Sequence, residues 1–151
     1  MKAAFLYNFT KFTEWPARHF AASDSPIIIG VLGSDSFGAE LEKIVRDRRV
    51  NGRAFVVRIL DPSAEAAAID VLFVAAGEES RFDRQSAEAL RTAGVLTVGE
   101  TPRFAALSGI ITFALEADKV RFEINQGAAE LAGLKLSAQL LKLATTVRKN
   151  P

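Results

Sequence analysis

The sequence predicts an α/β fold: a single-domain sandwich with a mostly parallel sheet, one antiparallel hairpin and helices on both faces. Three observations support this. The chain has 151 residues, the size of one ordinary domain with one core. Short β-branched apolar runs alternate with amphipathic stretches, as strands do with the helices that connect them. No repeat or linker rich in Pro, Gly or Ser divides the chain, so residues 1–151 are expected to form one domain.

The first predicted element is an amphipathic helix. Phe5, Phe9 and Phe12 fall at i, i+4 and i+7, which places the three rings on one helical face. Rings that share a face are expected to pack into the core. The helix should end at Trp15, because Pro16 pushes the residue before it out of the α region.

Strands and helices alternate through the middle of the chain. Each apolar run is too short for a helix and is rich in β-branched residues, which favours buried strands. Cap and turn signals open the helices: Gly33 turns the chain, Ser80 begins a capping box, and Thr101 precedes a proline. Strands are expected at 27–32, 54–60, 71–74 and 95–98, and helices at about 37–45, 80–90 and 101–109.

The last third of the chain predicts a hairpin and a closing helix. Two apolar runs flank a polar turn, and Asn51-Gly52 earlier in the chain is a further strong turn signal. Ser137 can cap a helix with an apolar side, whose basic residues lie towards the C-terminal end. The hairpin strands are expected at 110–115 and 120–124, the turn at 116–119, and the helix at 137–149.

The charge balance does not indicate a nucleic-acid partner. Nineteen basic residues stand against eighteen acidic ones, for a net charge of +1. Nucleic-acid-binding domains usually carry a clear basic excess on one face. The basic run Arg46-Asp47-Arg48-Arg49 follows a predicted helix, where cations suit the helix dipole. We interpret it as a solvated helix end, and the alternative is a polyanion contact.

Residue counts restrict the catalytic and metal chemistry. The chain has no cysteine and one histidine, which excludes a cysteine nucleophile and a His/Cys metal cluster. His19 lies in a polar segment and is interpreted as exposed and incidental. The segment Gly30–Gly38 joins a strand to a helix, but its glycine spacing fits no nucleotide-binding loop and Asp35 would repel a phosphate. No catalytic residue, metal or cofactor is predicted.

The best functional candidates are therefore surfaces for binding. Tyr7 and Trp15 carry amphipathic side chains of the kind that are common at interfaces. On a strand, Arg121 and Glu123 share one face while Phe122 points to the other. The two charged residues form either a salt bridge on a solvated face or a polar patch for a ligand or partner. The residues alone predict a binding module and leave its partner open.

Several segments, in order and over nearly the whole chain, resemble the YfiR-like family. Each segment is weak alone, but the ordered set is fairly specific. The segments are KAAFLYNFTKFTEWP (2–16), VLG (31–33) with FG (37–38), VNGR (50–53), VLFV (71–74), VLTV (95–98), GIITF (109–113), RFEIN (121–125) and LKLSAQLL (134–141).

The resemblance implies a periplasmic repressor whose signal peptide is replaced here by Met1. Family members restrain an inner-membrane GGDEF-type diguanylate cyclase by binding its periplasmic sensory domain. Release raises cyclic di-GMP and favours biofilm formation. The family also implies that the chain can form a homodimer. Disulfide-linked control, which some relatives allow, cannot be carried over because this chain has no cysteine.

Two patches are the predicted partner-binding residues, and two other functions stay open. The first patch is Tyr7, Lys11, Glu14 and Trp15, and the second is Arg121 and Glu123. One alternative is a periplasmic small-molecule sensor, with a pocket outside the carboxyl ends of the strands near 33–38 and 77–80. The other is a cytoplasmic enzyme, which an encoded signal peptide upstream of Met1 would argue against.

Overall fold

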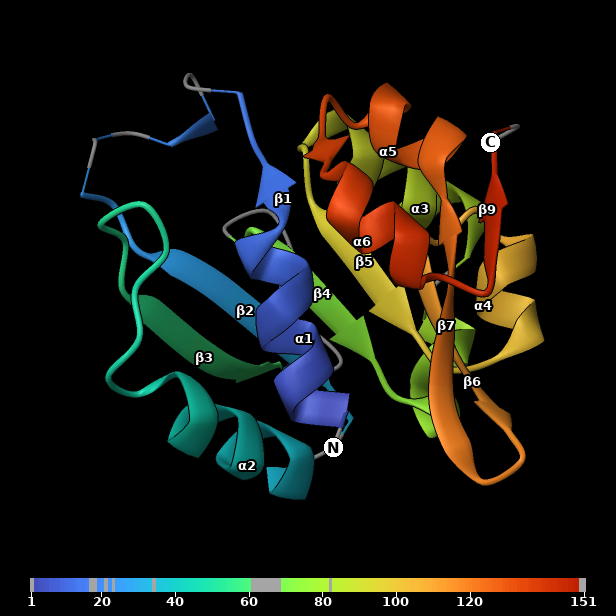
Figure 1. The fold of residues 1–151 in the computed structure, drawn as a ribbon, viewed down its shortest axis with the longest axis horizontal. Helices are drawn as coiled ribbons and strands as arrows, with labels where there is room; N and C mark the ends of the chain where they lie inside the picture. The colour runs from blue at the N-terminus through green and yellow to red at the C-terminus, as the bar shows by residue number, and fades with distance from the viewer. Residues whose placement is uncertain are drawn as a thin grey trace.

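The computed structural model describes residues 2–16, 19–20, 22, 24–33, 35–60, 69–81 and 83–149, and it contains a seven-stranded mixed sheet (Figure 1). Five strands run parallel, and the sixth pairs antiparallel with the fifth as a hairpin. The predicted α/β class, with a mostly parallel sheet and one hairpin, is confirmed. The strand order is β3 (Phe55–Leu60), β2 (Ile27–Leu32), β4 (Val71–Val74), β5 (Leu96–Gly99), β6 (Ile111–Glu116), β7 (Lys119–Asn125) and β9 (Thr146–Arg148).

Helices cover both faces of this sheet, as predicted (Figure 1). The alternation of strand β4 shows the two layers: Val71 and Phe73 belong to one apolar cluster, while Leu72 and Val74 belong to the other. The larger cluster includes residues of α1 (Lys2–Lys11), α2 (Asp35–Val45), α5 (Gln126–Leu131) and α6 (Ala138–Leu143). The smaller cluster includes residues of α3 (Arg84–Thr92) and α4 (Pro102–Ala106).

Helix α1 packs its phenylalanine face on the sheet. Phe9 is fully buried, and its ring centroid lies 5.5 Å from that of Phe113 and 4.8 Å from that of Phe122. Phe5 and Phe12 are half-buried against the same cluster. The predicted packing into the core is confirmed for Phe9, while Phe5 and Phe12 pack against the core from its margin.

The predicted end of the first helix is wrong. Helix α1 ends at Lys11, and the next residues form a short strand, β1 (Thr13–Glu14), which pairs antiparallel with β8 (Lys135–Leu136). The Phe12 carbonyl accepts the Ser137 N–H at 3.0 Å, so distant backbone groups replace the last helical bonds. Pro16 is therefore not the residue that stops the helix.

Both predicted turns are confirmed. Ala117 and Asp118 join β6 to β7 with φ values of 51° and 63°, and Asn51 and Gly52 have φ values of 53° and 80°. Positive φ at both central residues suits a two-residue hairpin turn, because its twist matches that of the flanking strands. The second of these turns places Arg53 two residues before the start of β3.

Two predicted helix boundaries need correction. Helix α3 begins after Asp83, not at Ser80, because Ala76–Arg81 form a 3₁₀ helix instead. Helix α6 is capped by Ser137 as expected but ends at Leu143, and β9 follows it. The β-branched Thr145 explains this end: its N–H and hydroxyl both donate to the Phe122 carbonyl, which ties the chain to strand β7.

The stability contributed by Asp83, the N-cap of α3, is expected to depend on pH. The Ser86 N–H donates to the Asp83 carboxylate at 2.7 Å, and this bond holds the pKa of Asp83 below its usual 3.8. A carboxyl with a lowered folded-state pKa stabilises the fold above its unfolded pKa and loses that contribution as pH falls through the folded pKa. We expect Asp83→Ala to lower the melting temperature at neutral pH, and the difference from wild type to shrink below pH 3.8.

Thermal unfolding followed by circular dichroism from neutral to acid pH measures this effect. Asp83→Ser is the matched control, because serine keeps a capping oxygen but does not ionise. A difference between wild type and Asp83→Ala that stays constant down to strongly acid pH would contradict the prediction.

No helix in the described part of the chain is both long enough and apolar enough to span a bilayer.

Candidate functional site

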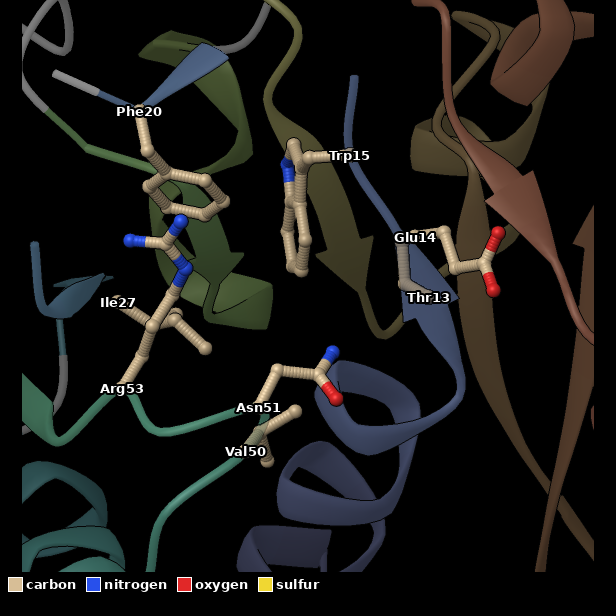
Figure 2. A pocket seen from close by; sticks show the side chains of 8 residues that line it. All are labelled: Thr13, Glu14, Trp15, Phe20, Ile27, Val50, Asn51 and Arg53. Carbon is tan, nitrogen blue, oxygen red and sulfur yellow. The ribbon is translucent and has the colours of Figure 1, made fainter. Parts of the chain in front are cut away.

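A hollow of about 290 Å³ lies at the end of the sheet where the parallel strands begin (Figure 2). Strand β1, the start of β2 and the turn before β3 contribute its walls. We call it the Trp15–Arg53 hollow. Its lining residues are Thr13, Glu14, Trp15, Phe20, Ile27, Val50, Asn51 and Arg53.

Aromatic rings and a guanidinium form the walls of the Trp15–Arg53 hollow. The Arg53 Cζ lies 3.7 Å from the centroid of the Phe20 ring, which is a close cation–π stack. Figure 2 shows Trp15 on one side and this stack on the other, while the Glu14 carboxylate points away from both. Aromatic rings and one cationic group therefore form opposite walls of the hollow, and the polar residues Thr13, Glu14 and Asn51 are also part of its lining.

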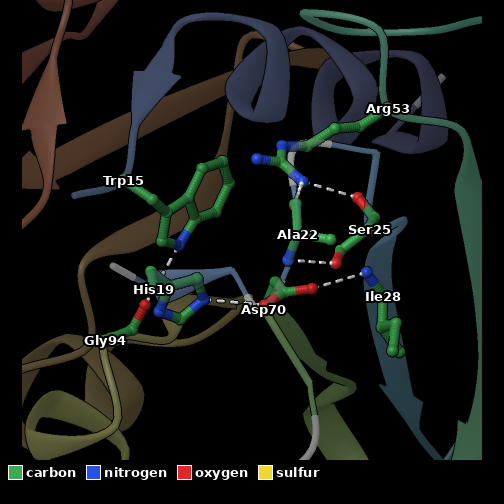
Figure 3. Close-up of polar contacts among 8 residues, drawn as sticks. All are labelled: Trp15, His19, Ala22, Ser25, Ile28, Arg53, Asp70 and Gly94. Atoms are coloured by element: carbon green, nitrogen blue, oxygen red, sulfur yellow. Dashed lines mark hydrogen bonds and ion pairs between the residues drawn. The ribbon is translucent and has the colours of Figure 1, made fainter. Parts of the chain in front are cut away.

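Hydrogen bonds hold the walls in place (Figure 3). The Trp15 indole N–H donates to the Gly94 carbonyl at 3.0 Å, which fixes the plane of the ring. One Arg53 nitrogen, Nη1, donates to the Ala22 carbonyl at 2.9 Å and the Ser25 carbonyl at 2.8 Å. Both groups that face the hollow are therefore oriented by backbone carbonyls from other segments.

His19 is part of this framework, and its predicted exposure is wrong. Only 12% of its side chain is accessible, and its Nε2 lies 2.7 Å from Asp70 Oδ1. The other Asp70 oxygen accepts the Ile28 N–H at 2.8 Å. The His19 N–H donates to the Pro16 carbonyl, and the His19 imidazole stacks on the Trp15 ring. The two hydrogen-bond partners are 51 residues apart, and no sequence spacing indicates such a pair.

The first predicted patch divides into exposed and packed side chains. Lys11 and Glu14 are exposed. Tyr7 is half-buried, with its ring 5.8 Å from that of Phe55 and 4.9 Å from the Arg48 Cζ. Trp15 is half-buried in the wall of the hollow. A partner can therefore reach Lys11 and Glu14 more readily than the two aromatic residues.

The second predicted patch lies on the opposite face of the sheet. Phe122 points at α1, so its neighbours Arg121 and Glu123 point away from that helix. Arg121 is exposed and Glu123 is half-buried. No ion pair joins these two described residues, so the structure does not show the salt bridge that the sequence left open. The two patches do not form one continuous surface.

Nothing in the sequence indicates that Phe20, Asn51 and Arg53 line a common site. The Asn51-Gly52 pair predicts a turn. No sequence pattern relates the arginine after this turn to Trp15. The junctions expected for a sensor pocket do meet, because Gly33 lies against the Glu78 side chain. They meet at the carboxyl ends of the strands, whereas the Trp15–Arg53 hollow lies at the other end.

Comparisons with known proteins identify the family and the fold. A family model described as YfiR/HmsC-like matches residues 1–145. No curated protein matches the chain significantly. A solved structure of a conserved domain protein from Vibrio cholerae O1 biovar El Tor has a TM-score of 0.61 and 15% identity over 80% of this chain. The chain spans about half of that protein, 54% of its length, and the likeness concerns the fold alone.

Proposed function

The chain belongs to the YfiR/HmsC-like family, and from this membership we propose that it binds and represses an inner-membrane GGDEF-type diguanylate cyclase. The family indicates a periplasmic regulator of diguanylate cyclase signalling, and its members are regulators and not catalysts. The family match over residues 1–145 carries the proposal. Repression would lower cyclic di-GMP and with it biofilm formation.

The mechanism requires unequal affinity for two states of the cyclase. A ligand that binds the active and inactive states equally shifts neither. To change the ratio of inactive to active cyclase from 1:99 to 99:1, the repressor must bind the inactive state about 10⁴-fold more tightly. We propose that it does so by holding the periplasmic sensory domain where the cytoplasmic domains stay apart.

The proposed contact residues are the two patches, Tyr7, Lys11, Glu14 and Trp15 on one side of the sheet and Arg121 and Glu123 on the other. Because the patches face opposite sides, one flat partner surface cannot cover both. Each patch therefore needs its own test. The exposed residues are the best ones to substitute in these tests, since substituting Tyr7 or Trp15 would also remove packing within the fold.

Removing the two exposed charges of the first patch is expected to weaken partner binding without affecting the fold. We expect the double variant Lys11→Ala, Glu14→Ala to bind the cyclase's periplasmic domain at least fivefold more weakly, because both charged contacts are lost. Substitutions of exposed side chains usually change stability by no more than about 0.5 kcal/mol. Calorimetric titration measures the affinity, and thermal unfolding checks the fold.

The matched control is Glu130→Ala, Lys142→Ala, which removes the same two charges from exposed positions elsewhere. Its affinity should equal that of wild type. The variant Arg121→Ala, Glu123→Ala tests the second patch in the same way. If both patch variants bind like wild type, the interface residues are wrongly assigned.

The host provides the test of the function itself. Deleting the gene should raise cyclic di-GMP, and a pull-down of membrane partners should recover a GGDEF protein. Unchanged cyclic di-GMP together with no recovered partner would reject the proposed function.

A further inference from the structure

Arg53 is a fixed cation with unused hydrogen-bond donors. Its Nη1 is occupied by two backbone carbonyls. Its Nε and Nη2 have no hydrogen-bond partner among the described residues. A guanidinium offers its N–H groups as a planar fork that matches a carboxylate. Because its position is already set by Ala22, Ser25 and Phe20, little side-chain freedom would be lost when an anion binds.

The charge around Arg53 favours an anionic occupant. Glu14 is the only acidic residue that lines the described hollow, and its carboxylate points away from Arg53 (Figure 2). Asp70 lies on the far side of the framework, where His19 and the Ile28 N–H occupy both carboxylate oxygens (Figure 3). No acidic side chain of a described residue forms a hydrogen bond or an ion pair with Arg53.

The dimensions of the hollow suit a side chain. Its volume of about 290 Å³ lies just below the range of about 300–1,000 Å³ that is usual for ligand pockets. Trp15, Phe20 and Ile27 give it apolar walls that can cover the carbon chain of an acidic residue. Water excluded by these rings would strengthen an ion pair with Arg53.

We propose that the Trp15–Arg53 hollow receives an acidic side chain from the periplasmic domain of the cyclase, and that Arg53 binds its carboxylate. This inference rests on the proposed function and makes it more specific. The occupant follows from charge complementarity and from continuity with the first patch, because Glu14 and Trp15 line the same hollow. Arg53 thereby becomes the central contact of the proposed interface.

The affinity of Arg53 variants for the partner tests the inference. The probe is the purified periplasmic domain of the GGDEF protein that the pull-down recovers. We expect Arg53→Gln to bind at least 30-fold more weakly, since truncating one member of a desolvated charge pair costs about 2 kcal/mol or more. Arg53→Lys should be intermediate, because it keeps the charge and loses the fork. Arg58→Gln, which removes the same charge from an exposed position on β3, should stay within twofold of wild type.

A double-mutant cycle separates binding from a structural role of Arg53. Each Asp and Glu of the partner domain is changed to its amide. At one position the loss should equal that of Arg53→Gln, and combining the two changes should add little further loss. Trp15 is the only tryptophan, so its emission in the unbound variants reports whether the wall of the hollow keeps its structure.

The outcomes separate this inference from the proposed function. If wild type binds the cyclase domain and Arg53→Gln binds like Arg58→Gln, the docking assignment is overturned while the function stands. The same holds if free benzoate saturably shifts Trp15 emission but no acidic residue of the partner couples to Arg53. If wild type binds no cyclase domain, the proposed function fails, and the docking assignment fails with it.

Discussion

Replacing Phe104 with alanine is expected to lower the free energy of unfolding by about 3–5 kcal/mol, the usual effect of emptying a buried phenylalanine site. Phe104 is fully buried in α4 and belongs to the smaller apolar cluster, between the sheet and α3. For a domain of this size, 1 kcal/mol corresponds to about 2–4 °C in melting temperature. Thermal unfolding should therefore show a loss of roughly 6–20 °C.

Two glycines, which have no side chain, leave room for the Phe104 ring. A Cβ added at either Gly99 or Gly109 would overlap the ring. Neither glycine has a positive φ, so alanine suits the backbone and only the clash with Phe104 opposes it. Because the ring is fully buried and cannot move aside, we expect Gly109→Ala to cost about 1–3 kcal/mol.

Two further variants check this explanation. Gly77→Ala is the matched control, because an added Cβ there meets no atom within 4 Å, and it should not lower stability. Phe104→Leu combined with Gly109→Ala should lose less than the sum of the single losses, since the smaller side chain makes room for the methyl group. Strict additivity would show that the glycine does not act through the ring.

Replacing Asp70 with alanine is expected to lower stability by about 2–4 kcal/mol and to disturb the Trp15–Arg53 hollow. Asp70 lies directly before β4, and its two oxygens bind His19 and the Ile28 N–H. The loss of Asp70 leaves both donors without a partner in a largely buried place. An unsatisfied buried donor destabilises a protein more than the removal of both hydrogen-bonding partners does. His19 would then no longer hold residues 19–20 against Trp15.

Two measurements test the effect of Asp70→Ala. Thermal unfolding reports the loss of stability, and the emission of Trp15, the only tryptophan, reports the change in the hollow. Asp70→Asn should be intermediate, since its amide oxygen still accepts one hydrogen bond. Asp47→Ala, at an exposed position, is the control for removing a negative charge. An Asp70→Ala protein with the stability and emission of wild type would show that the network has no role in the hollow.

The Trp15–Arg53 hollow shows why the sequence indicates some of its lining residues and not others. Trp15 was identified because an amphipathic aromatic side chain is a signal in itself. Arg53 and Phe20 were not, because their importance lies in the stack between them and in the two carbonyls that Arg53 binds. The sequence predicts an exposed His19, because nothing near it in the chain indicates Asp70 as its partner.

The amino-acid sequence by itself determined the alternation of strands and helices, the hairpin, the Asn51-Gly52 turn and the caps at Thr101 and Ser137. These depend on local patterns of apolar, turn and capping residues, which act within a few positions of each other. Only the tertiary structure decided the β1–β8 pairing and the Trp15–Arg53 hollow. It also decided that strand β9 stands in place of the last turns of the predicted C-terminal helix. It also placed the two predicted patches on opposite faces. The physical reason is that each of these features depends on hydrogen bonds and packing between distant segments, whose partners a local pattern does not specify.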